Sequence, residues 1–106
     1  MKWNRYYITV PKNEQGYKEH DIGIEHTENM EEFIVPEEEY IKLHRNGVFG
    51  VLENEYLDVY ISDGESSELS AEQLKKVYNA ISVLPGTFLT AVDKAIEYGT
   101  CILLDF

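Results

Sequence analysis

Cysteine is nearly missing from this sequence, which limits how the fold can be stabilised. The one cysteine, Cys101, has no partner within the chain, so an internal disulfide is excluded. It lies in the apolar stretch CILLDF, a setting that predicts a buried, unreactive thiol and agrees with a reducing cytosol. The fold must therefore be held together by its hydrophobic core.

Long apolar runs are also missing. No segment approaches the ~18 consecutive apolar residues that a membrane-spanning helix needs. The N-terminal stretch MKWNRYYITV starts with charged and polar residues and does not have the pattern of a signal peptide. We therefore expect a cytoplasmic protein with no membrane partner.

Basic residues are scarce, and their absence is concentrated in the middle of the chain. The sequence has 9 Lys and Arg against 20 Asp and Glu, which gives a net charge of −11. Nine acidic residues and no Lys or Arg lie between Lys18 and Lys42, and seven more acidic residues, again with no base, lie between Arg45 and Lys75. Such a field repels nucleic acid and attracts cationic proteins, although acidity can also serve solubility alone. We expect a basic protein partner and no nucleic acid.

Recognisable catalytic and metal-binding motifs are missing as well. On an extended segment His20 and His26 would lie about 20 Å apart at ~3.3 Å per residue, too far to share a metal ion. The chain has no G-x-S-x-G nucleophile motif and no phosphate-binding loop, and the acidic stretch SDGESSE at 62–68 lacks the spacing of a calcium loop. We expect no catalytic, metal or cofactor-binding residues, and hence a non-enzymatic protein. A small enzyme with a site built from scattered acids and histidines is the less favoured alternative.

The residues that are present predict a single folded domain over 1–106. Apolar residues make up 43% of the chain and aromatic residues 12%, so a folded chain is expected and not a disordered one. The segment 2–10 is rich in aromatic and β-branched residues and predicts a strand that ends at Pro11. Residues 11–20 are expected to form a turn or loop. Residues 20–26 alternate weakly and are expected to form a second strand that pairs back on the first as a hairpin.

The stretch ENMEEFIVPEEEY, residues 28–40, combines six glutamates with residues expected in the core, namely Phe33, Ile34, Val35 and Tyr40. Pro36 suits the first position of a helix, and Gly47 suits the position after its end. The glutamates at 37–39 then fall in the first turn, where carboxylates favour the positive end of the helix dipole. The glutamates at 28, 31 and 32 have no comparable local role.

The second half of the chain predicts two strands over 47–64, two helices and a last strand. Ser70 and Gln73 form a capping box that starts a helix, with Leu69 and Leu74 as a hydrophobic staple. A second helix is expected from Thr87, as its cap, to Gly99. The stretch TCILLDF is apolar on both faces, so it is expected inside a sheet. The predicted fold is α+β, with a mostly antiparallel sheet of four or five strands packed against two or three helices.

An acidic and aromatic surface is the feature most relevant to binding. If Leu57, Val59 and Ile61 form the core face of a strand, the side chains that alternate with them point outward. Carboxylates of further acidic residues flank this outward face. Tyrosine is enriched at binding hot spots, and carboxylates beside it pair with Arg or Lys of a partner. Tyrosines covered by a helix are an equally weighted alternative. The predicted partner-binding residues are Glu53, Glu55, Tyr56, Asp58, Tyr60, Asp63 and Glu65.

In size, its lone cysteine and its acid-rich middle segments ENMEEFIVPEEEY and ENEYLDVYISDGESSE, the chain resembles the small acidic immunity proteins of bacterial toxin–antidote systems, including the contact-dependent kind. The likeness is one of type, so it assigns no role to any residue. It implies an inhibitor that neutralises a basic toxin, such as a nuclease, by covering its cationic surface. A variant is a mimic of nucleic acid. The alternative from another class is an adaptor or homo-oligomer, including a homodimer, with Trp3, Arg5 and Tyr7 as the self-interface.

Overall fold

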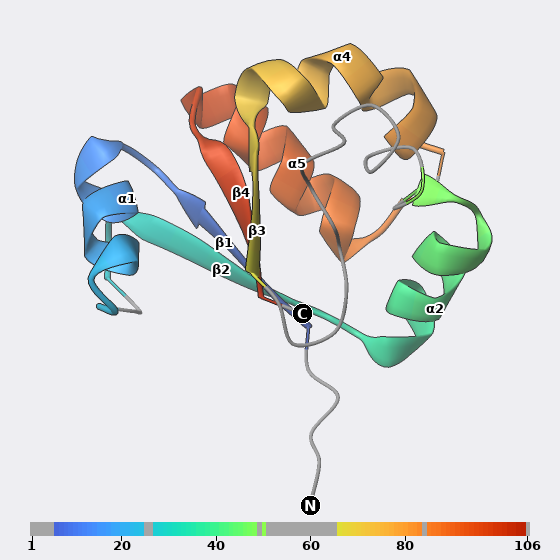
Figure 1. The fold of residues 1–106 in the computed structure, drawn as a ribbon, viewed down its shortest axis with the longest axis horizontal. Coiled ribbons are helices and arrows are strands. Elements are labelled where there is room, and N and C mark those ends of the chain that lie inside the picture. Colours follow the sequence, from blue (N-terminus) through green and yellow to red (C-terminus); the bar gives the residue numbers. More distant parts are fainter. Residues whose placement is uncertain (1–5, 25–26, 49, 51–65, 84, 106) are drawn as a thin grey trace, which may run out of the picture.

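The first and last of the described strands lie side by side in the middle of one antiparallel sheet (Figure 1). The structure is a computed structural model that describes residues 6–24, 27–48, 50, 66–83 and 85–105. Within these residues the strand order is β2-β1-β4-β3. The strands are β1 (Tyr6–Pro11), β2 (Met30–Val35), β3 (Ser66–Ser70) and β4 (Cys101–Asp105). The predicted α+β class and the internal position of the last strand are confirmed.

The helices lie on both sides of this sheet (Figure 1). Helices α4 and α5 pack on one face, and α1 lies at the end of the sheet where β2 begins. Helix α2 follows β2 directly and lies beyond its far end. The helices are α1 (Glu14–Asp21), α2 (Glu37–Arg45), α4 (Ala71–Ile81) and α5 (Thr87–Tyr98).

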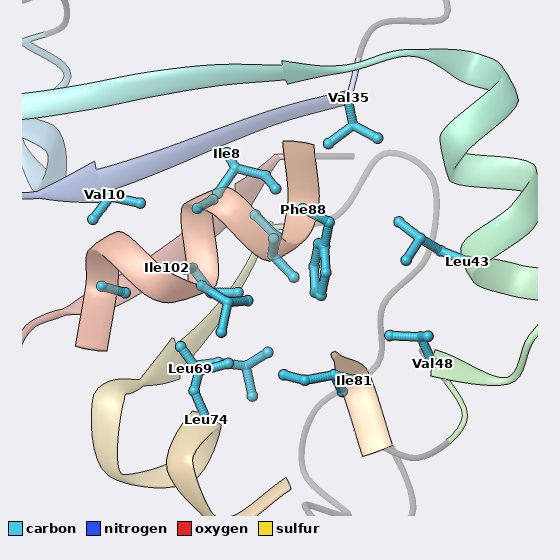
Figure 2. Packing of buried hydrophobic residues seen from close by; sticks show 14 of the residues in the cluster. Ile8, Val10, Val35, Leu43, Val48, Leu69, Leu74, Ile81, Phe88 and Ile102 are labelled. Atoms are coloured by element: carbon cyan, nitrogen blue, oxygen red, sulfur yellow. The ribbon is translucent and has the colours of Figure 1, made fainter. Parts of the chain in front are cut away.

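The hydrophobic core fills the space between the sheet and α2, α4 and α5. Figure 2 shows Phe88 in the middle of this core, with Leu43 and Val48 on one side and residues of the sheet on the other. The sheet contributes Ile8, Val10, Leu69, Ile102 and Leu104, which are at most 2% exposed. Tyr6 on β1 also stacks on Tyr40 of α2, with ring centroids 3.8 Å apart. Burial of these side chains is the main stabilising term, at about 1.5–3 kcal/mol for each large one.

The start of α4 follows the sequence prediction closely. The Ser70 side chain accepts a hydrogen bond from the backbone N–H of Gln73, and the Gln73 side chain accepts one from the backbone N–H of Ser70. Leu69 and Leu74 are both fully buried, as a hydrophobic staple requires. The capping box is therefore confirmed.

The predicted starts of α2 and α5 are each displaced by one position. Pro36 is the N-cap of α2 and not its first helical residue. Gly86 and not Thr87 is the N-cap of α5, and neither cap residue makes a side-chain capping bond. Both helix ends are confirmed, because Gly47 and Gly99 adopt the positive φ values of 74° and 69° that favour glycine.

The prediction of a loop at 11–20 and a hairpin strand at 20–26 is wrong. Residues 14–21 form α1, which begins after Asn13, whose side chain accepts a hydrogen bond from the Gly16 backbone N–H. The next described strand along the chain is β2, the stretch MEEFIV, and it pairs antiparallel with β1. A helix forms here because Asn13 caps its N-terminus and because the Glu14–Lys18 ion pair spans one helical turn.

Two further expectations need correction. Ile34 was expected in the core, but it lies on the opposite face of β2 and is 50% exposed. The strand expected from residue 47 does not begin there, because Val48 and Gly50 have helical backbone. The remainder of the two strands expected over 47–64 lies outside the described residues.

Candidate functional site

The sheet has a second face, opposite the hydrophobic core, which we call the outer sheet face. Successive side chains of a strand point to opposite faces. Because Tyr6, Ile8 and Val10 point into the core, Tyr7 and Thr9 point to the outer sheet face. The register then assigns the alternate residues of the other strands to the same face.

Side chains cross the outer sheet face in rows that follow the register. In one row Thr9 is opposite Glu32 on β2 and opposite Leu103 on β4, and Leu103 is opposite Glu68 on β3. This row therefore has a glutamate on each outermost strand of the described sheet and apolar or small side chains between them. In the neighbouring row Tyr7 is opposite Ile34.

A third row, next to α1, is closed to solvent. It contains Met30, Pro11 and Cys101, all of which are buried. Helix α1 comes so close to this end of the sheet that a Cβ atom on Gly16 would overlap the backbone carbonyl of Asn29. The glycine is therefore required for this close approach.

Helix α1 also reaches the far edge strand. The Tyr17 hydroxyl donates a hydrogen bond of 2.7 Å to a carboxylate oxygen of Glu68. This bond raises the pKa of Tyr17 to about 12, because ionisation would place a phenolate against the carboxylate. Glu68 is thereby fixed at the rim of the outer sheet face, and its charge is retained because the donor is neutral.

The accessible part of this face is a candidate binding surface. We call it the outer strip and define it as Tyr7, Glu32, Ile34, Glu68 and Leu103. Tyr7, Glu32 and Leu103 are half-buried, Ile34 is half exposed and Glu68 is exposed. An apolar centre with carboxylates at its two ends is suited to a partner that presents apolar and basic side chains together.

Other acidic residues of the middle segment are also held by neutral donors. Glu31 accepts a hydrogen bond of 2.7 Å from the Tyr98 hydroxyl, which raises the pKa of Tyr98. Glu19 accepts hydrogen bonds from Thr27 and Asn29, which lower the pKa of this carboxyl. These contacts hold the carboxylates in place without cancelling their charge.

The ion pairs in the described part of the chain include three within single helices. Lys18 pairs with Glu14, Lys75 with Glu72 and Lys94 with Glu97, each within one helical turn. The carboxylates of Glu19, Glu31 and Glu68 are instead held by the hydroxyl and amide donors described above. Lysines from the two flanks of the chain therefore do not neutralise these three carboxylates through the ion pairs seen here.

Glu39 has a structural role that the sequence analysis did not identify. Its two carboxylate oxygens accept hydrogen bonds from the backbone N–H groups of Thr87 and Phe88, at 2.9 and 2.8 Å. A residue of α2 thus caps α5, which has no capping side chain of its own.

The six glutamates of residues 28–40 therefore include one, Glu39, that joins two helices. Two others, Glu31 and Glu32, lie on an outermost strand of the described sheet. Charged residues on such strands discourage edge-to-edge aggregation.

A shallow groove between α4 and α5 is a separate feature. It has a volume of about 310 Å³ and is lined by Lys75, Tyr78, Asp93 and Ile96. The Tyr78 hydroxyl donates a hydrogen bond to Asp93, which raises the pKa of Tyr78. The lining thus combines the hydrogen-bonded pair Tyr78 and Asp93 with Lys75 and the apolar side chain of Ile96.

The partner-binding residues predicted from the sequence all fall within 51–65 and so lie outside the described residues. The predicted burial of Cys101 is confirmed: the residue is 4% exposed, and burial raises the pKa of its thiol to about 12, as expected of an unreactive cysteine. His44 lies in the last turn of α2, beside the Tyr40 hydroxyl. Among the residues that the structure describes, no three His, Cys, Asp or Glu side chains are grouped so that they could hold a metal ion.

Comparison with models of protein families, with curated protein sequences and with solved structures gives no match for this chain. In the described part of the chain, each helix is too short or too polar to span a bilayer.

Proposed function

We propose that this chain is a non-enzymatic inhibitor of the immunity type, which neutralises a basic toxin in the cytoplasm by covering its cationic surface. A nuclease is the simplest such toxin, since it needs cationic side chains to hold phosphates. The partner is a protein, and neither nucleic acid nor membrane is bound.

The observation that carries this proposal is the retained negative charge of the middle of the chain. The segment between Lys18 and Lys42 contains nine acidic residues and no Lys or Arg. Where the structure describes them, carboxylates of this segment such as Glu19, Glu31 and Glu39 are held by hydroxyl, amide and backbone N–H donors. A field of this kind accelerates association with a cationic protein, and fast association matters when the target is lethal.

The test begins with the neighbouring gene. An immunity gene is expected directly downstream of a larger gene that encodes a basic C-terminal domain. Production of that domain alone should stop growth, and production of this chain with it should restore growth. The two purified proteins should form a complex whose association rate falls as ionic strength rises from about 0.01 M to 0.15 M, because the Debye length shortens from ~30 to ~8 Å.

The proposal fails if the neighbouring domain is not basic, or if the chain restores no growth. It also fails if the complex forms at the same rate at both ionic strengths. A matched inactive toxin domain, with its catalytic residue replaced, separates binding from enzymatic damage in these measurements.

A further inference from the structure

We propose that the outer strip binds an extended segment of the partner with the pattern basic–x–apolar–x–basic, which lies across the strands. This inference rests on the proposed function, because it assumes the same class of partner. It adds the surface that binds the partner and the residue pattern that this surface recognises. The apolar side chain of the segment contacts Leu103 and Tyr7, and its two basic side chains pair with Glu32 and Glu68.

The spacing of the two glutamates supports this pattern. Glu32 and Glu68 are in one row of the register and lie on the two outermost strands of the described sheet. Three spacings between neighbouring strands, at ~4.8 Å each, separate them by ~14 Å. In an extended chain, residues i and i+4 point the same way and lie ~13 Å apart at ~3.3 Å per residue. Two basic residues with this separation therefore match the two glutamates.

The apolar centre of the strip needs an apolar partner. Ile34 is 50% exposed, and Tyr7 and Leu103 are half-buried. All three lie on the outer sheet face, which α1 covers only at the end of the sheet where β2 begins (Figure 1). Residue i+2 of the bound segment points to the same side as i and i+4, so an apolar residue there would lie between the two basic ones.

A second copy of this chain does not fit the outer strip. Two strips packed face to face would bring the glutamates of one copy near those of the other, and like charges in contact cost several kcal/mol at an interface. The net charge of −11 adds long-range repulsion between copies. Charge complementarity therefore selects a basic partner over self-association.

The test uses three peptides and the full chain labelled with ¹⁵N. The first is acetyl-Arg-Ser-Leu-Ser-Arg-amide; the second has the same composition in the order Arg-Arg-Leu-Ser-Ser; the third is Glu-Ser-Leu-Ser-Glu. The first peptide should shift the amide resonances of Tyr7, Ile34 and Leu103. The second should bind about 2–5-fold more weakly, since it can form only one of the two exposed ion pairs at a time. The third should cause no shift.

Variants of the chain localise the effect. Glu68→Gln keeps an acceptor for the Tyr17 hydroxyl but removes the charge, so it should weaken the first peptide about 2–5-fold. Ile34→Ser should weaken it as well, whereas Glu38→Gln, an exposed site on α2, should leave it unchanged. Equal binding of the first two peptides, an unchanged affinity in Glu68→Gln, or no shift at the three amides with any peptide would overturn the proposal.

The same variants separate this proposal from the proposed function. If the toxin domain binds Ile34→Arg and Glu68→Lys as tightly as the natural chain, the outer strip is not the interface, while the inhibitor function stands. If the first peptide binds the strip with the expected variant effects but the neighbouring basic domain does not bind at all, the strip stands and the inhibitor function fails.

Discussion

Replacement of Glu39 should uncouple α2 from α5 and lower the stability of the whole fold. The carboxylate accepts two backbone hydrogen bonds at the first turn of α5, where the helix dipole also favours a negative charge. No side chain at the N-cap of α5 can take over, because that residue is Gly86. The α5 helix contributes Phe88 to the centre of the core, so weakening its start affects the packing around that ring.

The magnitude follows from the geometry. Loss of a capping side chain costs about 0.5–2 kcal/mol, and one hydrogen bond to a charged group contributes about 1.5–3 kcal/mol. The two bonds share one half-buried carboxylate, so their contributions do not add fully. We expect Glu39→Ala to lower the free energy of unfolding by about 2 kcal/mol and Glu39→Gln by about 1 kcal/mol, because the amide retains one acceptor oxygen. At about 4–8 °C per kcal/mol for a domain of this size, Glu39→Ala should lower Tm by roughly 8–16 °C.

Urea unfolding followed by circular dichroism measures this change, with Glu38→Ala and Glu38→Gln as matched controls in the same helical turn. Amide hydrogen exchange gives a local readout, since the Thr87 and Phe88 amides should exchange faster in Glu39→Gln than their neighbours later in α5. If Glu39→Ala unfolds within about 0.5 kcal/mol of Glu38→Ala, the range of an ordinary surface substitution, the link between α2 and α5 does not stabilise the fold.

Three further predictions concern α1 and the segment 51–65. Gly16→Ala should destabilise the chain by more than 2 kcal/mol or displace α1, because the added methyl group would overlap the Asn29 carbonyl. The control Gln15→Ala, at an exposed position, should have little effect. Equal midpoints of urea unfolding for the two variants would contradict the close approach of α1 to Asn29. Tyr17 has a pKa of about 12 in the folded chain against an ordinary value of 10.0, so its contribution to stability should be complete below pH 10 and should be lost as the pH rises toward 12. In Tyr17→Phe the fall in the urea midpoint between pH 10 and 11.5 should be smaller than in the natural chain, and an identical fall would argue against the bond to Glu68. Charge reversal of Glu53, Glu55 and Asp58 together should slow association with the basic partner and flatten its dependence on salt; an unchanged association rate measured by stopped flow would remove this acidic segment from the interface.

Local sequence signals predicted the parts of the fold that depend on neighbouring residues. The capping box at Ser70 and Gln73, the glycine stop at Gly99 and the burial of Cys101 are each encoded within a few positions, and each is confirmed. The α1 helix was missed although Asn13, Glu14 and Lys18 provide a cap and an ion pair. Its need for a glycine comes from contact with Asn29, which the sequence alone does not reveal.

The β2 strand was missed because its pattern depends on its position in the sheet. The stretch MEEFIV does not alternate cleanly between apolar and polar residues. It therefore lacks the two-residue periodicity by which a half-buried strand is predicted from sequence. Glu31 points to the same face as Val10, yet it lies where the Tyr98 hydroxyl can reach it, and Ile34 points to the outer sheet face. The outer strip combines residues of four strands from both ends of the chain, so no local pattern could have identified it.

The position of β4 beside β1 sets the order in which the chain can fold during synthesis. The two central strands are the first and the last that the structure describes, and Tyr7 is opposite Asp105 across the sheet. Until residues 101–105 leave the ribosome, β1 and β3 have no common neighbour, and Ile102 and Leu104 are missing from the core. Completion of the sheet therefore follows translation of its final strand, and the half-formed domain presents the open edge of β1 to other chains in the meantime.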